Sequence, residues 1–187
     1  MNIDISNIAE ENHRYAIHLA TFQNIIAYTN GSYDIKDILS EREPFEAVDF
    51  WRNISLSAEI LLKACLLKHH TPFFKKRAHS EYGEKVTAVE NKWLDETLRK
   101  LEIDYVAQIN SGTVNTALKL AEKELFGRIS IDAEKTKLIT EMFYIIIRTR
   151  RNRNSHFFFP NQGHIDITEV EMLFLPLLNL LEELYKL

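Results

Sequence analysis

Residues 44–69 have the sequence PFEAVDFWRNISLSAEILLKACLLKH, and this stretch decides the fold class. Its apolar residues recur at helical spacing, and Pro44 suits the first turn of a helix, where a backbone N–H is not needed. The apolar stripe is wide enough for a helix that is covered on several sides. We therefore predict a central helix over 44–69 that buries Phe50, Trp51, Ile54, Ala58, Leu61, Leu62, Cys65 and Leu66.

Helical periodicity also dominates the chain before and after this segment. Over residues 4–28 it predicts a first helix that ends at Asn30-Gly31-Ser32, with an apolar stripe of Ile8, Tyr15, Leu19, Phe22 and Ile26. Residues 71–84 have the composition of a loop, and helices are predicted over 85–101 and 113–126, the latter stopped by Gly127.

Two aspartates mark the starts of the remaining helices. Asp132 is expected to cap a helix that carries Leu138, Ile139, Met142, Phe143, Ile146 and Ile147 and ends around residues 154–156. Asp166 and Glu169 have the spacing of a capping box, with which the last helix begins. The chain contains no linker or repeat. We therefore expect one all-α domain over residues 1–187, an up-and-down helical bundle of about five or six helices.

Composition excludes several classes of protein. The 187 residues are 45% apolar and 27% charged, which excludes wholesale disorder, and only 5 Gly and 4 Pro disfavour a sandwich, a barrel or a glycine-rich nucleotide fold. One cysteine excludes an internal disulfide and a thiolate zinc cluster. The sequence has no secretory signal and no apolar run of the roughly 20 residues that a membrane span needs. We expect a cytoplasmic protein without membrane association.

Four arginines lie within six residues at 148–156, which read RTRRNRNSH. The formal charge of the whole chain is −4, and removing these four positive charges from −4 would leave −8. A pI near 6.0 argues against a protein that holds nucleic acid through bulk positive charge, but it leaves room for a local basic site. Four cations exceed what capping of a helix C-terminus requires. Because guanidinium groups suit phosphate, we expect contacts to phosphate from Arg148, Arg150 and Arg153.

His156 follows this cluster, where the helix is expected to end. Asn152 and His156 share a face of the last helical turn, and unwinding that turn would bring the imidazole toward Arg151. An imidazole can move protons near neutral pH, and a guanidinium can stabilise a crowded phosphorane. Such a pair suffices for metal-free RNA cleavage by the ribose 2′-OH, a group that DNA lacks.

Residues 151–156, RNRNSH, resemble the R-x4-6-H signature of the HEPN superfamily, in the form with a polar residue directly after the arginine. The context is similar too, with an apolar helix before the motif and aromatic residues after it. Residues 51–66, WRNISLSAEILLKACL, resemble the other recurring helix of HEPN domains, with its Ala-Glu and Lys-Ala pairs.

This resemblance implies a helical-bundle, metal-independent endoribonuclease that needs no cofactor. It implies that Arg151 and His156 are catalytic, that Asn152 is a polar helper and that Arg150 is the alternative to Arg151. Such proteins commonly act in toxin–antitoxin or phage-defence systems, with an antitoxin or another defence protein as partner. Many are homodimers in which two copies of the motif build one composite site. One subgroup has a tyrosine two residues after the histidine, which a nucleotidyltransferase can modify, but Phe158 stands there in this chain.

Several other residues have simpler explanations. Glu59 and Lys63 have the spacing of an ordinary intrahelical ion pair, with a role of Glu59 in orienting a motif arginine as a secondary possibility. Cys65 and His69 could share a metal, but a core cysteine is the favoured interpretation, and no metal site is expected. Core positions are expected for Trp51 and Trp93, core or interface positions for Phe157 to Phe159, and a solvated charge run for 75–77.

Two hypotheses of different classes follow. The first is a HEPN-type endoribonuclease that cleaves RNA with Arg151 and His156. The alternative is a non-catalytic helical module that recognises a partner protein or an anionic ligand through the same basic helix end. The two differ in whether exchange of His156 abolishes RNA cleavage or alters binding alone.

Overall fold

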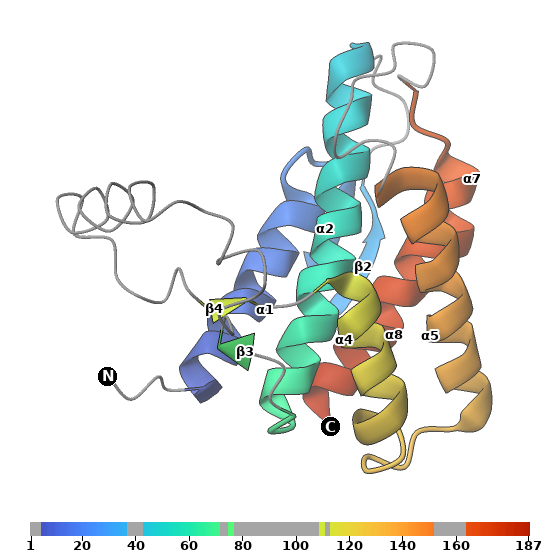
Figure 1. The fold of residues 1–187 in the computed structure, drawn as a ribbon. Coiled ribbons are helices and arrows are strands. Elements are labelled where there is room, and N and C mark those ends of the chain that lie inside the picture. Colours follow the sequence, from blue (N-terminus) through green and yellow to red (C-terminus); the bar gives the residue numbers. More distant parts are fainter. Residues whose placement is uncertain (1–4, 37–42, 72–74, 77–108, 111–112, 152–163) are drawn as a thin grey trace, which may run out of the picture.

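A computed structural model of the chain describes residues 5–36, 43–71, 75–76, 109–110, 113–151 and 164–187. Most of these residues are helical, which confirms the prediction of a mainly helical chain (Figure 1). The α-helices are α1 (Ile5–Thr21), α2 (Pro44–Lys68), α4 (Val114–Leu120), α5 (Ala133–Ile146), α7 (Ile167–Glu169) and α8 (Leu175–Lys186). Turns of π-helix extend α4, α5 and α7: η2 (Ala121–Leu125), η3 (Ile147–Arg151) and η5 (Val170–Phe174).

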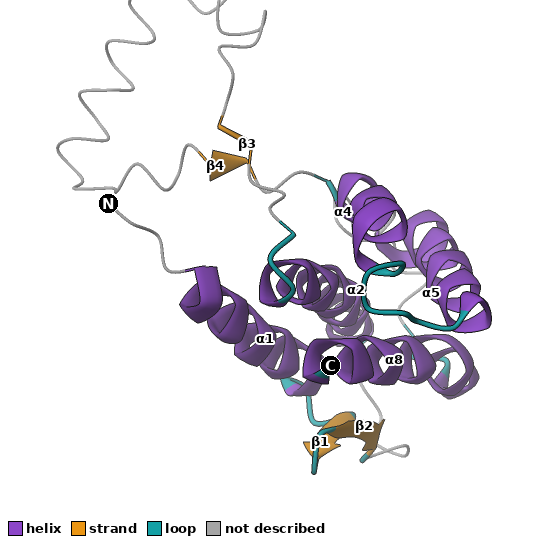
Figure 2. Ribbon diagram, turned by 90° about the horizontal axis from the view of Figure 1, so that it is seen from below, coloured by secondary structure: helices purple, strands orange, loops and turns teal. Residues whose placement is uncertain are grey.

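Helix α2 is central, as predicted, and its observed bounds differ from the predicted ones by one residue at the C-terminal end. Viewed along the bundle, α1 lies on one side of α2 and α4 and α5 lie on the other, with α8 alongside (Figure 2). The whole predicted stripe of α2 is at most 2% exposed. The turn before α2 is closed by a hydrogen bond from the Glu43 backbone N–H to Glu46 Oε2 at 3.0 Å.

Helix α1 packs on the bundle through small residues and through part of the predicted stripe: Leu19 and, after the helix, Ile26 are buried, and Ile8 packs against the core. Ala9 and Ala16 are fully buried, and Ser57 Oγ of α2 donates to the Ala16 carbonyl at 2.7 Å. Tyr15 is 49% exposed and Phe22 61% exposed, so their predicted core positions are wrong. Alanine allows two helix backbones to approach closely, and large side chains are then left on the outside.

The first helix was predicted too long, because residues 26–35 form a β-hairpin. Strands β1 (Ile26–Thr29) and β2 (Ser32–Ile35) pair antiparallel, with Thr29 opposite Ser32. The two turn residues both have positive φ, 55° at Asn30 and 79° at Gly31, as a type I′ turn requires. Asn-Gly is a strong hairpin signal, and here it joins two strands instead of ending a helix. The hairpin also departs from a strictly all-α fold.

The hairpin is fixed to the bundle by one face of α8. Asn179 acts like a neighbouring strand, since its Oδ1 accepts from the Tyr33 N–H at 2.8 Å and its Nδ2 donates to the Tyr33 carbonyl at 3.1 Å. Two turns further on, Lys186 Nζ donates to the Gly31 carbonyl at 2.6 Å. An isolated two-stranded hairpin is marginally stable, so these contacts supply what a third strand would give.

Glu182, on the same face of α8, connects α1, the hairpin and α8. It is 1% exposed, and its carboxylate accepts from Tyr28 Oη at 2.6 Å and contacts His13 Nε2 at 2.7 Å. Burial alone would raise the pKa of Glu182, but the hydrogen bonds from His13 and Tyr28 and the charges of His13 and Lys186 outweigh it and lower that pKa. Burial and the Glu182 carboxylate raise the pKa of the Tyr28 hydroxyl, which therefore stays a donor.

The remaining described elements follow the predictions closely. Thr113 caps α4, and Asp132 caps α5 by accepting from the Glu134 N–H at 2.9 Å. The predicted core residues of α5 are buried except Leu138, which is 41% exposed. Within the predicted loop over 71–84, however, Lys75–Lys76 (β3) forms a short strand that pairs with Ile109–Asn110 (β4), which the sequence did not predict. The predicted helix over 85–101 and Trp93 lie outside the described residues. Within the described ranges, no helix is both long and apolar enough to cross a membrane.

Candidate functional site at the arginine-rich end of α5

The arginine cluster begins within η3, and the predicted motif over 151–156 begins at the last residue of η3. Arg150 and Arg151 are the last two residues of η3, so the helix carries the arginine cluster to its end. The start of α2 and helix α7 lie at this same end of the bundle (Figure 1). The side chains of Arg148 and Arg151 are outside the described part of the structure, as are residues 152–163, which include Asn152, Arg153, His156 and Phe157 to Phe159.

Arg150 is held between an aromatic ring and a carboxylate. Its guanidinium carbon lies 3.9 Å from the ring centroid of Trp51, within the range of a cation–π contact. Its Nε donates to Glu169 Oε1 at 2.8 Å, and its Nη2 donates to the other oxygen, Glu169 Oε2. The two side chains are only 12% and 21% exposed. This is a bidentate, partly buried arrangement of the kind that fixes a guanidinium in one orientation.

Both partners of Arg150 are themselves fixed. Trp51 is fully buried in α2, and its Nε1 donates to the His164 carbonyl at 3.0 Å. Glu169 belongs to α7, whose first turn is capped by the Asp166 carboxylate, which accepts from the Thr168 N–H at 2.9 Å. Arg150 thus connects three elements: η3, α2 and α7. Trp51 is a core residue, as predicted.

These contacts bear on the predicted role of Arg150 as a phosphate ligand. Its positive charge is already matched by Glu169, and one face of its guanidinium is covered by Trp51. A phosphate would have to displace a bidentate carboxylate to reach it. The arrangement that the structure describes is therefore an anchor for the end of η3.

Glu59 and Lys63 form the predicted i to i+4 ion pair on α2, with 2.8 Å between Lys63 Nζ and Glu59 Oε1. The pair is far more buried than an ordinary surface pair, since the two side chains are 8% and 12% exposed. Loss of one partner would leave the other charge in a poorly solvated place, which costs more than a surface pair is worth. Orientation of a motif arginine by Glu59 stays a prediction, because the Arg151 side chain is not among those described.

Cys65 is a core residue, as predicted. It is fully buried, and its Sγ donates to the Leu181 carbonyl at 3.3 Å. Burial, with the Glu182 charge as a further cause, raises the pKa of the Cys65 thiol. His69 Nε2 lies 2.8 Å from the Leu184 carbonyl. Across the described side chains, no group of three or more His, Cys, Asp or Glu is arranged to hold a metal ion.

Sequence reasoning missed the partnership of Trp51, Arg150 and Glu169. Each residue had a local explanation: Trp51 as core, Arg150 as part of a basic cluster and Glu169 as the end of a capping box. The only available signal was that one arginine of the cluster precedes an acidic residue at the start of the next helix. Nothing in that spacing predicts that the two would meet.

Comparisons with known proteins found no match for this chain among protein families, curated proteins or solved structures. The HEPN resemblance therefore rests on residues 51–66 and 151–156 of this chain alone.

Proposed function

We propose that this chain is a metal-independent endoribonuclease of HEPN type that cleaves RNA with Arg151 and His156, and that it acts as a toxin or phage-defence effector. The observation that carries the proposal is the arginine-rich motif at the end of α5 and η3, where one arginine is anchored to the bundle. A motif on an anchored helix end can hold its reacting groups in a fixed geometry, which catalysis requires.

The chemistry needs only the chain's own side chains and the RNA. The ribose 2′-oxygen attacks the adjacent phosphorus, the bond from phosphorus to the 5′-oxygen breaks, and the products are a 2′,3′-cyclic phosphate and a 5′-hydroxyl. His156 transfers protons between these oxygens, and Arg151 stabilises the charge that builds up on the phosphoryl oxygens. Asn152 assists as a hydrogen-bonding neighbour of the reacting phosphate.

The contacts of Arg150 support Arg151 as the catalytic arginine of the motif. Successive residues of a helix point in directions about 100° apart, so Arg151 cannot take the place of Arg150 between Trp51 and Glu169. One arginine then anchors the helix end, and the next is the one assigned to RNA.

The outer surface of α5 supports the proposed homodimer. Leu138 and Ile145 are seven residues apart, so they lie on one face of the helix, and they are 41% and 48% exposed. Tyr144 beside them is 46% exposed. Pairing of two α5 helices through these residues would bring two copies of the motif to one interface, as a composite site needs.

The test compares wild type with His156→Ala, each incubated with mixed RNA in EDTA. We expect wild type to produce fragments with 2′,3′-cyclic phosphate ends and the variant to produce none, with unchanged circular dichroism. His18→Ala serves as the matched control, because His18 lies on α1, which is on the other side of α2 from α5 (Figure 2). Equal cleavage by wild type and His156→Ala would overturn the proposal.

An inactive wild type would support the alternative, a non-catalytic module that binds a partner protein or an anionic ligand through the basic helix end. In that case the exchange of motif residues would alter binding and leave every RNA intact.

A further inference from the structure

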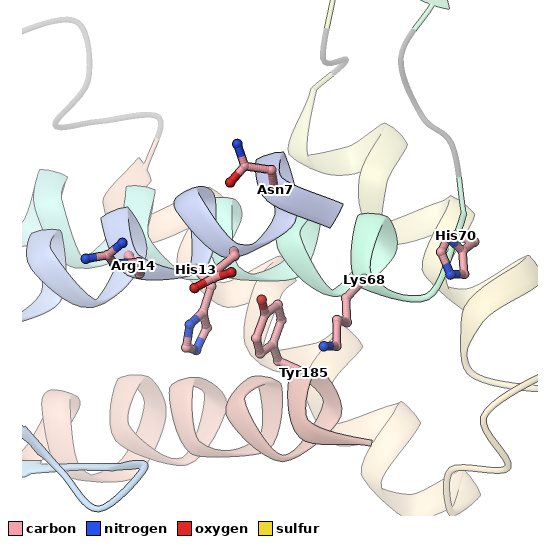
Figure 3. Close-up of a pocket in the computed structure, with 7 residues that line it drawn as sticks. Asn7, His13, Arg14, Lys68, His70 and Tyr185 are labelled. Atoms are coloured by element: carbon pink, nitrogen blue, oxygen red, sulfur yellow. The ribbon is translucent and has the colours of Figure 1, made fainter. Parts of the chain in front are cut away.

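A pocket of about 820 Å³ opens where the first part of α1 meets the C-terminal ends of α2 and α8 (Figure 3). These helix ends lie at the opposite end of the bundle from η3 and α7 (Figure 1). The pocket is therefore separate from the candidate RNA site. Its volume is in the range of pockets that bind small molecules, and far larger than one ion fills.

The described lining of this pocket has more basic than acidic side chains. Lys68 and Arg14 both line it, and Glu10 is its only carboxylate among the described lining residues. No described carboxylate pairs with Lys68, whose Nζ instead lies 5.5 Å from the ring centroid of Tyr185. Arg14 contacts Glu11 at 3.3 Å, but both side chains are more than 60% exposed, so this pair contributes little and is easily exchanged for another anion.

One wall of the pocket consists of two rings held in place. His13 and Tyr185 stack with centroids 4.0 Å apart and planes 2° apart, and Glu182 fixes His13 from behind. Burial, then the charge of Glu10, raises the pKa of Tyr185, so its hydroxyl stays protonated and can donate. His13 covers one face of the Tyr185 ring, and Lys68 lies over the ring. A ligand would therefore meet hydrogen-bond donors and charges in this pocket rather than a free aromatic face on which to stack.

The turn after α2 keeps a further histidine at the pocket in an uncommon conformation. His70 has φ of 53°, where glycine is usual, and the Thr71 N–H closes the turn on the Leu66 carbonyl at 2.7 Å. Arg128 braces the turn by donating to the His69 carbonyl and to Thr71 Oγ1. A left-handed residue directly after a helix is a common way for the helix to end, so these contacts fix the position of His70 at the pocket.

We propose that this pocket binds the phosphate group of a small phosphorylated molecule of about mononucleotide size. Lys68 contacts the phosphate oxygens, with the Tyr185 hydroxyl beside it as a further donor, while Arg14 and His70 stand at opposite sides of the pocket, where they can contact the rest of the ligand (Figure 3). The remaining volume takes the part of the ligand that carries the phosphate. This proposal does not depend on RNA cleavage at the other end of the bundle.

The test titrates the full chain at low ionic strength with inorganic phosphate, AMP and ATP, followed by two-dimensional NMR. We expect saturable shifts at Lys68, His70 and Tyr185, with a nucleotide binding more tightly than inorganic phosphate. Lys68→Gln should weaken binding about tenfold or more, as expected for one lost charge-assisted hydrogen bond. Lys137→Gln is the matched control, because Lys137 is 76% exposed on α5, away from the pocket.

The outcomes separate the two sources of phosphate. Tighter binding of AMP or ATP identifies a nucleotide, and equal binding of all three identifies the phosphate group alone as the recognised part. No saturable shift with any of the three would overturn the proposal, as would an affinity that is the same in wild type and Lys68→Gln. RNA cleavage by Lys68→Gln without ligand should equal that of wild type, so failure here leaves the proposed function untouched.

Discussion

Arg150 shows how one residue in a charged cluster can differ from its neighbours. It contacts a buried ring and a carboxylate from two other elements, and its charge is matched within the bundle. A cluster of four arginines invites the view that all four serve one anion. The contacts instead set Arg150 apart from the rest of the cluster as an anchor, and the role of the other arginines in RNA cleavage is part of the proposed function.

Arg150→Lys should lower the free energy of unfolding by about 1–2 kcal/mol, because lysine keeps the charge but cannot make the bidentate contact with Glu169. In RNA cleavage we expect kcat to fall and KM to change little, since Arg150 acts on the position of the helix end. Urea unfolding and steady-state kinetics measure the two effects. Arg14→Lys, in an exposed pair, should change stability by less than about 0.5 kcal/mol.

A different kinetic pattern would contradict this assignment. If Arg150→Lys raised KM for RNA and left both kcat and stability unchanged, Arg150 would be a phosphate ligand rather than an anchor.

Glu182 makes the free energy of unfolding depend on pH. Its pKa is lowered in the folded state, so the stabilisation that it provides is present above the pKa of an unfolded glutamate and is lost as the pH falls through the folded-state pKa. Glu182→Gln should therefore be less stable than wild type at pH 7, by about 1.5–3 kcal/mol for a hydrogen bond to a charged group. The difference should shrink as the pH falls below about 4. Urea unfolding of both proteins across this range measures it, and a difference that stayed constant with pH would contradict the role of the charge.

At the scale of elements, the hairpin and α8 depend on one another. Three residues of α8, spaced at 179, 182 and 186, meet the hairpin at its second strand, its first strand and its turn. Gly31 lies in the turn with φ of 79°, and a Cβ there would come within 2.0 Å of Lys186 Nζ.

Gly31→Ala should lower the free energy of unfolding by about 1–2 kcal/mol, the cost of a left-handed residue with a side chain, and should displace Lys186 from the Gly31 carbonyl. Gly127→Ala is the matched control. A Cβ at Gly127 meets nothing within 4 Å and its φ is outside the left-handed region, so we expect no loss of stability there. Thermal unfolding of both variants checks the contrast, and equal effects would contradict it.

Local signals in the sequence predicted much of the fold. The wide stripe of α2 and the side-chain caps at Asp132 and Asp166 act within a few residues, so periodicity and spacing identify them. The hairpin was missed because apolar residues at Leu19, Phe22 and Ile26 continue the helical pattern of α1 into the first strand. Its stability comes from Asn179, which is 146 residues away from Tyr33, and no local pattern contains that contact.

The same reason limits prediction of the candidate site. The arginine cluster and His156 are visible in the sequence, whereas the anchoring of Arg150 needs Trp51 and Glu169 to be brought together by the packing of α2 against η3 and the start of α7. The Lys68 pocket has no sequence signal at all, since its residues come from three helix ends.

At the scale of the whole molecule, the exposed apolar face of α5 makes the oligomeric state testable. Ile145→Glu should convert the proposed dimer into a monomer and abolish RNA cleavage, because a buried glutamate without a partner is costly at an interface. Sedimentation velocity and the cleavage assay measure the two effects. Phe22→Glu, at a residue 61% exposed on α1, is the control and should stay dimeric and active. A monomeric wild type that cleaves RNA would contradict the composite site.

The contact between His13 and Glu182 has a consequence for how fast the bundle forms. It joins residues 169 positions apart, whereas α1 and α2 meet across a much shorter stretch of chain. Closing so long a loop is slow, because the chain loses conformational entropy before the contact between His13 and Glu182 contributes any stabilisation. We therefore expect α1 and α2 to pair early in folding, and the hairpin to be fixed in place only after α8 has docked.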